Sequence, residues 1–138
     1  MKQLSIKYGT IRRLGQNERM PYALLLLADE TKEAIHKYID DAEIYVLEKN
    51  SRIIAVYVLQ HINQKNAEIK NIAVDESAQG QGIGKSLLRD ATKRAKDKGY
   101  QHLLIGTANG AIKQLYLYQK EGFEMVSIRM NIFCGQLS

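Results

Sequence analysis

Three alternating glycines, Gly80, Gly82 and Gly84, stand between an apolar, strand-like segment that ends at Val74 and a segment with helical periodicity. Backbone N–H groups at the start of a helix have no partner inside the helix and lie at the positive end of its dipole. Because glycine has no Cβ, a phosphate oxygen can approach these amides closely, and Lys85 adds a positive charge. The stretch therefore predicts an anion-binding loop between a strand and a helix.

Three glycine-rich phosphate motifs compete for this stretch. A P-loop requires Gly-x-x-x-x-Gly-Lys-Ser/Thr; residues 84–86 fit its end, but Gln79 occupies its first position. The dinucleotide fingerprint Gly-x-Gly-x-x-Gly fits Gly80 and Gly82 and then requires a glycine where Lys85 stands. A third pattern, Gln/Arg-x-x-Gly-x-Gly/Ala, matches in full from Gln79 onward. A glycine-rich turn that only caps an ordinary helix is the structural alternative.

The composition is that of one globular domain over residues 1–138. Hydrophobic residues make up 45% and charged residues 25% of the chain, and 138 residues are enough to bury a core. The 20 Lys and Arg against 15 Asp and Glu give a net charge of +5, which suits a polyanionic ligand such as a nucleotide or CoA. The basic residues form no long run and are not interleaved with aromatic residues, so nucleic-acid binding is an alternative that the sequence does not require.

The sequence argues against a membrane span, secretion and a bound metal. No apolar run is longer than Ile53–Leu59, which is far too short to cross a bilayer, and residues 1–5 lead into no signal-peptide core. Cys134 is the only cysteine, so no intrachain disulfide can form and a reducing compartment is the default. The histidines are scattered, without metal-ligand spacing, at positions 36, 61 and 102. We therefore expect a cytoplasmic protein with no metal and no membrane or nucleic-acid partner.

The apolar periodicity predicts an ordered series of elements. After a short lead-in at residues 1–10, it predicts a strand at 10–14, helices at 21–28 and 31–39, strands at 44–47, 52–59 and 67–74, a helix from 83 to a stop at Gly99, a strand at 103–107, a helix at 111–121 and one last strand at 123–133. Short turns make the three middle strands an antiparallel meander, with 52–59 buried on both faces. The strand at 103–107 follows a helical crossover and should run parallel to 67–74. Asp90 and Arg94, four residues apart, predict a weak ion pair on the helix surface.

Motifs and element order together resemble the GNAT superfamily of N-acetyltransferases over roughly residues 11–133. The segment from Gln79 to Gly84 resembles its acyl-CoA pyrophosphate loop, and residues 118–123, Tyr-Gln-Lys-Glu-Gly-Phe, resemble its Tyr-x-x-x-Gly-Phe signature. The resemblance implies an α/β (α+β) GNAT fold, with a mixed, mostly antiparallel sheet of about six strands flanked by about four helices. As function it implies transfer of an acetyl group from acetyl-CoA directly to a primary amine of a small molecule or a protein. A catalytically inactive CoA-binding regulatory module of the same fold is the alternative.

The resemblance also implies where acetyl-CoA binds. The diphosphate would bind the amides of Gln81 to Lys85, and the strand ending at Val74 would splay from its parallel neighbour so that the pantetheine pairs with Ile72 and Val74. The thioester carbonyl would lie near Ala73, polarised by a backbone N–H there. The implied cofactor-binding residues are Ile72, Ala73, Val74, Gln79, Gly80, Gln81, Gly82, Ile83, Gly84, Lys85 and Asn109.

Two side chains are implied as catalytic. Tyr118 would protonate the departing CoA thiolate, with Tyr116 as its substitute if the helix is rotated. Glu68 matches the strand position at which some members keep a general base, although a water chain serves other members. A base is useful because an amine with a pKa near 10.4 costs about 4 kcal/mol to keep neutral at pH 7.4. The helices predicted at 21–39 would wall the acceptor pocket or serve packing alone.

The C-terminal end departs from the family pattern. Members commonly end with a hairpin of two strands, but only five residues follow Phe133 in this chain. We therefore expect the last strand to be missing, shortened or supplied by another subunit, and an open sheet edge there would favour a homodimer.

Overall fold

The computed structural model describes residues 4–6, 9–106, 118–127 and 132–137. Within these residues the chain forms an eight-stranded mixed sheet in the order β1-β2-β3-β4-β5-β6-β8-β7. The strands are β1 Leu4–Ile6, β2 Gly9–Arg13, β3 Ala42–Lys49, β4 Arg52–His61, β5 Asn66–Val74, β6 His102–Gly106, β7 Glu124–Ser127 and β8 Ile132–Gln136. The helices are α1 Tyr22–Ala28, α2 Lys32–His36 and α3 Ile83–Asp97, with single 3-10 turns at Ile39–Asp41 and Glu76–Ala78.

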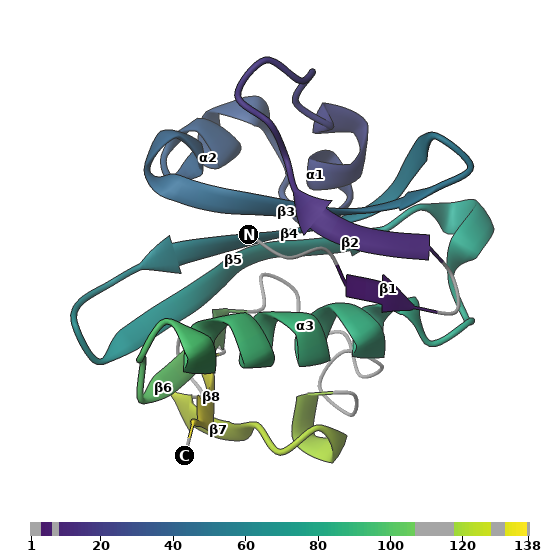
Figure 1. The fold of residues 1–138 in the computed structure, drawn as a ribbon. Coiled ribbons are helices and arrows are strands. Elements are labelled where there is room, and N and C mark those ends of the chain that lie inside the picture. The colour runs from purple at the N-terminus through teal and green to yellow at the C-terminus, as the bar shows by residue number, and fades with distance from the viewer. Residues whose placement is uncertain (1–3, 7–8, 107–117, 128–131, 138) are drawn as a thin grey trace.

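Helices cover both faces of this sheet. In Figure 1, α1 and α2 lie on one side of the central strands and α3 lies on the other side. All neighbouring strands pair antiparallel except β5 and β6, which are parallel and joined through α3. The predicted fold class, a mostly antiparallel mixed sheet between helices, is confirmed.

Two hydrophobic cores lie on the two faces, and β4 contributes to both. Its residues Ala55, Tyr57 and Leu59 belong to the core under α3, whereas Val56 and Val58 belong to the core under α1 and α2. Alternate residues of a strand point to opposite faces, so a strand with helices on both sides must be apolar throughout. This confirms the prediction of a central strand buried on both faces.

The helix ends follow local sequence. Gly99 has φ +91°, and the amides of Gly99 and Tyr100 donate back to the carbonyls of Lys96 and Ala95 at 3.0 and 3.2 Å. This is the Schellman arrangement, in which a glycine ends the helix in the left-handed conformation. The same pair of bonds recurs after Tyr118: Gly122 has φ +92° and Phe123 N–H donates to the Tyr118 carbonyl at 2.9 Å. The start of the helix predicted at 111–121 lies outside the described residues.

The Asp90–Arg94 pair differs from the prediction because it is buried. Asp90 is 4% exposed and Arg94 is 7% exposed. Asp90 Oδ2 accepts from Arg94 Nε at 2.8 Å and from the Tyr57 hydroxyl at 2.6 Å, and the guanidinium lies 4.4 Å from the ring centroid of Tyr45. The pair therefore forms a polar contact between α3 and the sheet. Its i, i+4 spacing is the same for a buried and a solvent-exposed pair, so the spacing alone could not predict the burial.

The two ends of the chain add strands to the sheet. At the N-terminus, Leu4–Ile6 pairs antiparallel with β2 as an edge strand. At the C-terminus, the prediction of one strand at 123–133 is wrong, since β7 and β8 form an antiparallel pair and β8 lies between β6 and β7. Of the three alternatives for the last strand, the structure excludes that it is missing or supplied by another subunit, because this chain provides β8. The sequence has no glycine or proline between Ser127 and Ile132 that would indicate a turn between two strands. Because this chain supplies the strand itself, the argument for a dimer from a missing strand no longer holds.

Candidate active site

The N-terminus of α3 is open and positively polarised. Gly82 is its N-cap residue, in the left-handed conformation with φ +82°, and no side chain caps the helix or places an acid in its first turn. The first intrahelical hydrogen bond of α3 is donated by the Ser86 amide to the Gly82 carbonyl, at 3.2 Å. The N–H groups of Gly82 to Lys85 consequently have no intrahelical partner, as expected for an anion site.

The glycines of this loop have different conformations. Gly80 and Gly82 both have positive φ, and a Cβ added to either would have no protein atom within 4 Å. The space above these two residues is thus open. Gly84 lies inside the first turn of α3 and does not share the left-handed conformation. Only Gly80 and Gly82 are therefore required by backbone conformation.

Side chains fix the loop between β5 and α3. Asp75 accepts from the Ser77 amide at 3.1 Å and from the Ser77 hydroxyl, and it lies 3.6 Å from Arg52 Nη2. The hydroxyl and amide of Ser77 hold the pKa of Asp75 below its usual value. Gln79 Nε2 donates to the Val74 carbonyl at 3.0 Å. The side chain of Gln79 thus ties the loop to the end of β5, and its backbone N–H donates to the Glu76 carbonyl at 3.4 Å.

The parallel strands β5 and β6 pair over only part of their length. Their register runs from Asn66 opposite His102 to Ile69 opposite Ile105. Beyond this point, which we call the fork, β5 continues through Val74 with no β6 partner among the described residues. We call the β6-facing side of Lys70 to Val74 the free edge.

A β-bulge at Lys70 accompanies the fork. Opposite β4, Asn71 pairs with Val58 and Ile69 pairs with Leu59, so Lys70 is the extra residue. A bulge bends a strand and increases its twist. It also changes the face to which each side chain points. Ile69 belongs to the core under α3, whereas after the bulge it is Ile72 and Val74 that pack against that core.

The bulge brings two consecutive polar side chains to the α1–α2 face. The Lys70 ammonium lies 5.9 Å from the Tyr38 ring centroid, and Asn71 Nδ2 donates to the Leu25 carbonyl at 2.9 Å. Asn71 Nδ2 also reaches the Tyr38 hydroxyl at 3.1 Å and Asp29 Oδ2 at 3.0 Å, and Tyr38 donates to the same carboxylate. This buried cluster ties the ends of α1 and α2 to β5 beside the fork. This cluster was not among the residues predicted from the sequence, although adjacent polar residues in an alternating strand are a signal for a bulge.

Glu68 lies at the fork on the same face. Its carboxylate is 3.2 Å from Lys70 Nζ, and Glu68 Oε2 is 3.7 Å from the position of a Cβ added to Gly106, the last residue of β6. The side chains of Glu68 and Lys70 are 18% and 30% exposed. The candidate base is therefore partly buried, paired with a cation and adjacent to the end of the free edge.

Tyr118 lies on the opposite side of the sheet. It is 3% exposed and belongs to the core under α3, the same cluster that contains Ile69 and Ile105 of the fork. Burial raises the pKa of Tyr118 to about 12. The phenol is consequently protonated at neutral pH. Asn109 and Tyr116, the other predicted residues of this region, lie outside the described residues.

The histidines each have a separate partner. His36 bonds Tyr22, His61 bonds Tyr100 and His102 bonds Asn66, at 2.8, 2.7 and 3.0 Å. Among the described residues no cluster of His, Cys, Asp and Glu could hold a metal ion.

Within the same residues, none of the helices has both the length and the apolar character that a membrane crossing requires.

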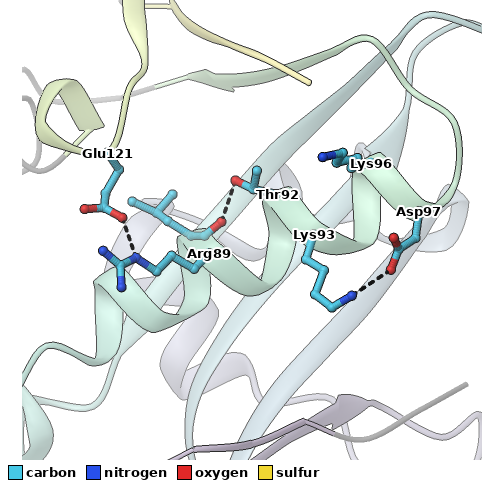
Figure 2. Close-up of a pocket in the computed structure, with 7 residues that line it drawn as sticks. Arg89, Thr92, Lys93, Lys96, Asp97 and Glu121 are labelled. Atoms are coloured by element: carbon cyan, nitrogen blue, oxygen red, sulfur yellow. Dashed lines mark hydrogen bonds and ion pairs between the residues drawn. The ribbon is translucent and has the colours of Figure 1, made fainter. Parts of the chain in front are cut away.

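Two surface hollows lie away from the fork. The hollow in Figure 2 follows the outer side of α3, where ion pairs join Arg89 to Glu121 at 2.8 Å and Lys93 to Asp97 at 3.3 Å. The second hollow lies between α1 and the loop after β5 and is lined by Pro21, Ala23, Leu24, Leu27, Arg52, Ile53, Asp75, Glu76 and Ser77. None of the residues predicted from the sequence to bind acetyl-CoA or act in catalysis lines either hollow.

Comparison with known proteins identifies the family. Residues 40–125 match the profile of the acetyltransferase (GNAT) domain. The chain is 43% identical over 133 residues to the uncharacterized N-acetyltransferase YvbK of Bacillus subtilis, covering 96% of this chain and 83% of that protein. The chain therefore belongs to the GNAT acetyltransferase family.

Solved structures agree with this assignment. A GNAT family acetyltransferase from Elizabethkingia anophelis, solved with acetyl-CoA bound, superimposes with a TM-score of 0.89 at 38% identity, covering 96% of this chain and 100% of that one. A Bacillus subtilis acetyltransferase in complex with CoA gives a TM-score of 0.83 at 33% identity, covering 93% and 98%.

Proposed function

We propose that this protein transfers an acetyl group from acetyl-CoA to a primary amine. The observation that carries the proposal is the free edge of β5, which begins at the fork and leads to the open N-terminus of α3. A ligand with an anionic end and an extended, amide-containing arm fits both features. The acetyl-CoA and CoA bound to the two similar acetyltransferases support this choice of ligand.

The length of the free edge suits the pantetheine arm. Residues Lys70 to Val74 span about 16 Å at 3.3 Å per residue. With the diphosphate on the amides of Gln81 to Lys85, the arm would add to β5 as an extra strand. It must stop at the fork, because β6 occupies the edge from there on. The thioester would thus lie beside the fork.

Strand geometry selects the amide that polarises the thioester. The Asp75 amide donates to Ile54 of β4 at 2.8 Å, and successive amides along a strand point to alternate sides. The Ala73 amide then points to β4 as well, whereas the amides of Val74 and Ile72 point to the free edge. We therefore assign the oxyanion-stabilising donor to the Ile72 N–H in place of the amide at Ala73.

In the proposed reaction, the amine nitrogen attacks the thioester carbonyl, so that a C–N bond forms and the C–S bond breaks. Of the two protons that the acceptor ammonium loses, one passes to Glu68, directly or through water, and then to solvent, and the other ends on the CoA sulfur. A thiol has a pKa near 8.5, so complete transfer from a Tyr118 phenol with a pKa of about 12 is uphill by about 5 kcal/mol. Tyr118 would then stabilise the departing thiolate mainly by donating a hydrogen bond.

Two measurements test the proposal. Calorimetry should detect acetyl-CoA binding, and release of free CoA thiol across a panel of primary amines should detect turnover. Tyr118→Phe and Glu68→Gln should lower kcat and leave acetyl-CoA affinity within a few-fold of the original. Binding without turnover on any amine would favour a regulatory CoA-binding module, and absence of binding would refute both functions. The single cysteine suits the reducing cytoplasm as the compartment of this activity.

A further inference from the structure

Glu68 and Lys70 form an ion pair that ties no two elements of the fold together. They are two residues apart on one strand, with carboxylate and ammonium 3.2 Å apart. The longer-range ion pairs, such as Arg12 to Glu48 and Lys98 to Glu43, connect different elements. The side chains of Glu68 and Lys70 are 18% and 30% exposed, so a ligand can reach the pair, and a ligand that carries both charges replaces the contact that it breaks.

The pair also lies where an acceptor must approach. It is at the fork, over Gly106, on the α1–α2 face. The opposite face at this point is filled by the core under α3, which contains Ile69, Ile105 and Tyr118. An amine that attacks a thioester at the end of the free edge therefore comes from the face that carries both charges.

The neighbouring polar groups leave Lys70 available to an anion. Asp29 is the carboxylate of the buried cluster, and it accepts from Tyr38 and from Asn71. Glu68 is the carboxylate that pairs with Lys70 among the described residues. A ligand carboxylate at Lys70 would thus meet a cation whose present partner can turn to the ligand's ammonium.

We propose that the acceptor is an α-amino acid, with its carboxylate on Lys70 and its ammonium against Glu68. This inference rests on the proposed acetyltransferase function and names its substrate class. The ammonium nitrogen and the nearest carboxylate oxygen of an α-amino acid are roughly 3 Å apart, close to the separation of the two protein charges. The acceptor's two charges therefore complement the pair, and the nitrogen lies next to both the base and the thioester.

The test compares matched acceptors that differ only in the carboxylate, L-phenylalanine and L-phenylalaninamide, in the thiol-release assay. The free acid should have a kcat/KM at least tenfold above that of the carboxamide. Lys70→Met should remove this preference by raising KM for the acid alone, and Lys70→Arg should retain most of it. Lys93→Met, which removes one charge of the Lys93–Asp97 pair on the outer side of α3 (Figure 2), is the matched control and should leave both acceptors unchanged.

The outcomes separate this inference from the proposed function. Turnover of the carboxamide and simple amines but not of the acid would overturn the inference and leave acetyl transfer intact. Such a result would indicate an acceptor like a peptide N-terminus, whose amine has no adjacent carboxylate. Equal loss of both acceptors in Lys70→Met would overturn it too, because Lys70 would then act on the site as a whole. Absence of acetyl-CoA binding by the unmodified protein would refute the proposed function and the inference with it. Circular dichroism of each variant confirms that it is folded.

Discussion

Gly82→Ala tests the anion site most directly, because its expected effects on folding stability and on acetyl-CoA affinity can be worked out separately from the structure. Gly82 has φ +82°, and an added Cβ would contact no protein atom within 4 Å. The variant therefore suffers only the left-handed strain of a non-glycine residue, roughly 1–2 kcal/mol. A domain with 5–15 kcal/mol of stability remains folded after such a loss.

The loss of binding free energy for acetyl-CoA should be larger than this loss of folding stability. The new methyl group would stand in the open space above the amides that start α3, where the diphosphate is proposed to lie. A hydrogen bond to a charged group is worth about 1.5–3 kcal/mol. Losing two such bonds at the lower value removes about 3 kcal/mol, which corresponds to at least a 100-fold rise in the Kd for acetyl-CoA.

Gly99→Ala is the matched control. Gly99 lies just beyond the other end of α3, has φ +91° and likewise has no protein atom within 4 Å of an added Cβ. Both variants should lose similar free energy of unfolding in urea titrations, but calorimetry should show weakened acetyl-CoA binding only for Gly82→Ala. Equal acetyl-CoA affinities in the two variants would refute the placement of the diphosphate on these amides.

Three further predictions concern the fold. Asp90→Ala leaves a buried guanidinium without its carboxylate and should cost about 3–5 kcal/mol in urea unfolding; a loss below 1 kcal/mol would show that the pair behaves as a surface pair. Gly135→Ala places a methyl carbon 2.9 Å from the Phe123 ring and should cost about 1–3 kcal/mol in the same assay, an expectation that an unchanged midpoint would contradict. The pKa of Glu18 is lowered from 4.5 to about 2 by the Arg12 guanidinium and the Gly15 amide, so the stability that it adds is present above pH 4.5 and is lost as the pH falls through about 2. A carboxyl carbon titrating near pH 4.5 in NMR spectra would be the contrary result.

The local elements could be predicted from the sequence because their signals are local. Apolar residues without interruption from Ile53 to Leu59 indicate a strand buried on both faces, and the structure places β4 there. Gly99 marks the end of α3 because only glycine adopts positive φ without strain. The glycine loop is likewise predictable, since an unpaired helix start and residues without a Cβ are properties of a short segment.

The register and burial of side chains could not be predicted in this way. Asp90 and Arg94 have the spacing of a surface ion pair, and only the packing of α3 on the sheet buries them. The division of the last segment into β7 and β8 is marked by no glycine or proline in the sequence, and only the pairing of β8 with both β6 and β7 reveals it.

The sequence by itself determined the order of the elements from β2 to β6, the glycine loop before α3 and the resemblance to an acyl-CoA-binding family, because each rests on residues close together in the chain. Only the tertiary structure decided that the bulge at Lys70 turns that side chain to the same face as Asn71 and that, among the described residues, the pairing of β5 with β6 ends at Ile69. Strand pairing sets both features, and pairing depends on neighbours that are distant in sequence. The juxtaposition of Glu68 and Lys70 at the fork, on which the proposed acceptor class depends, follows from that pairing.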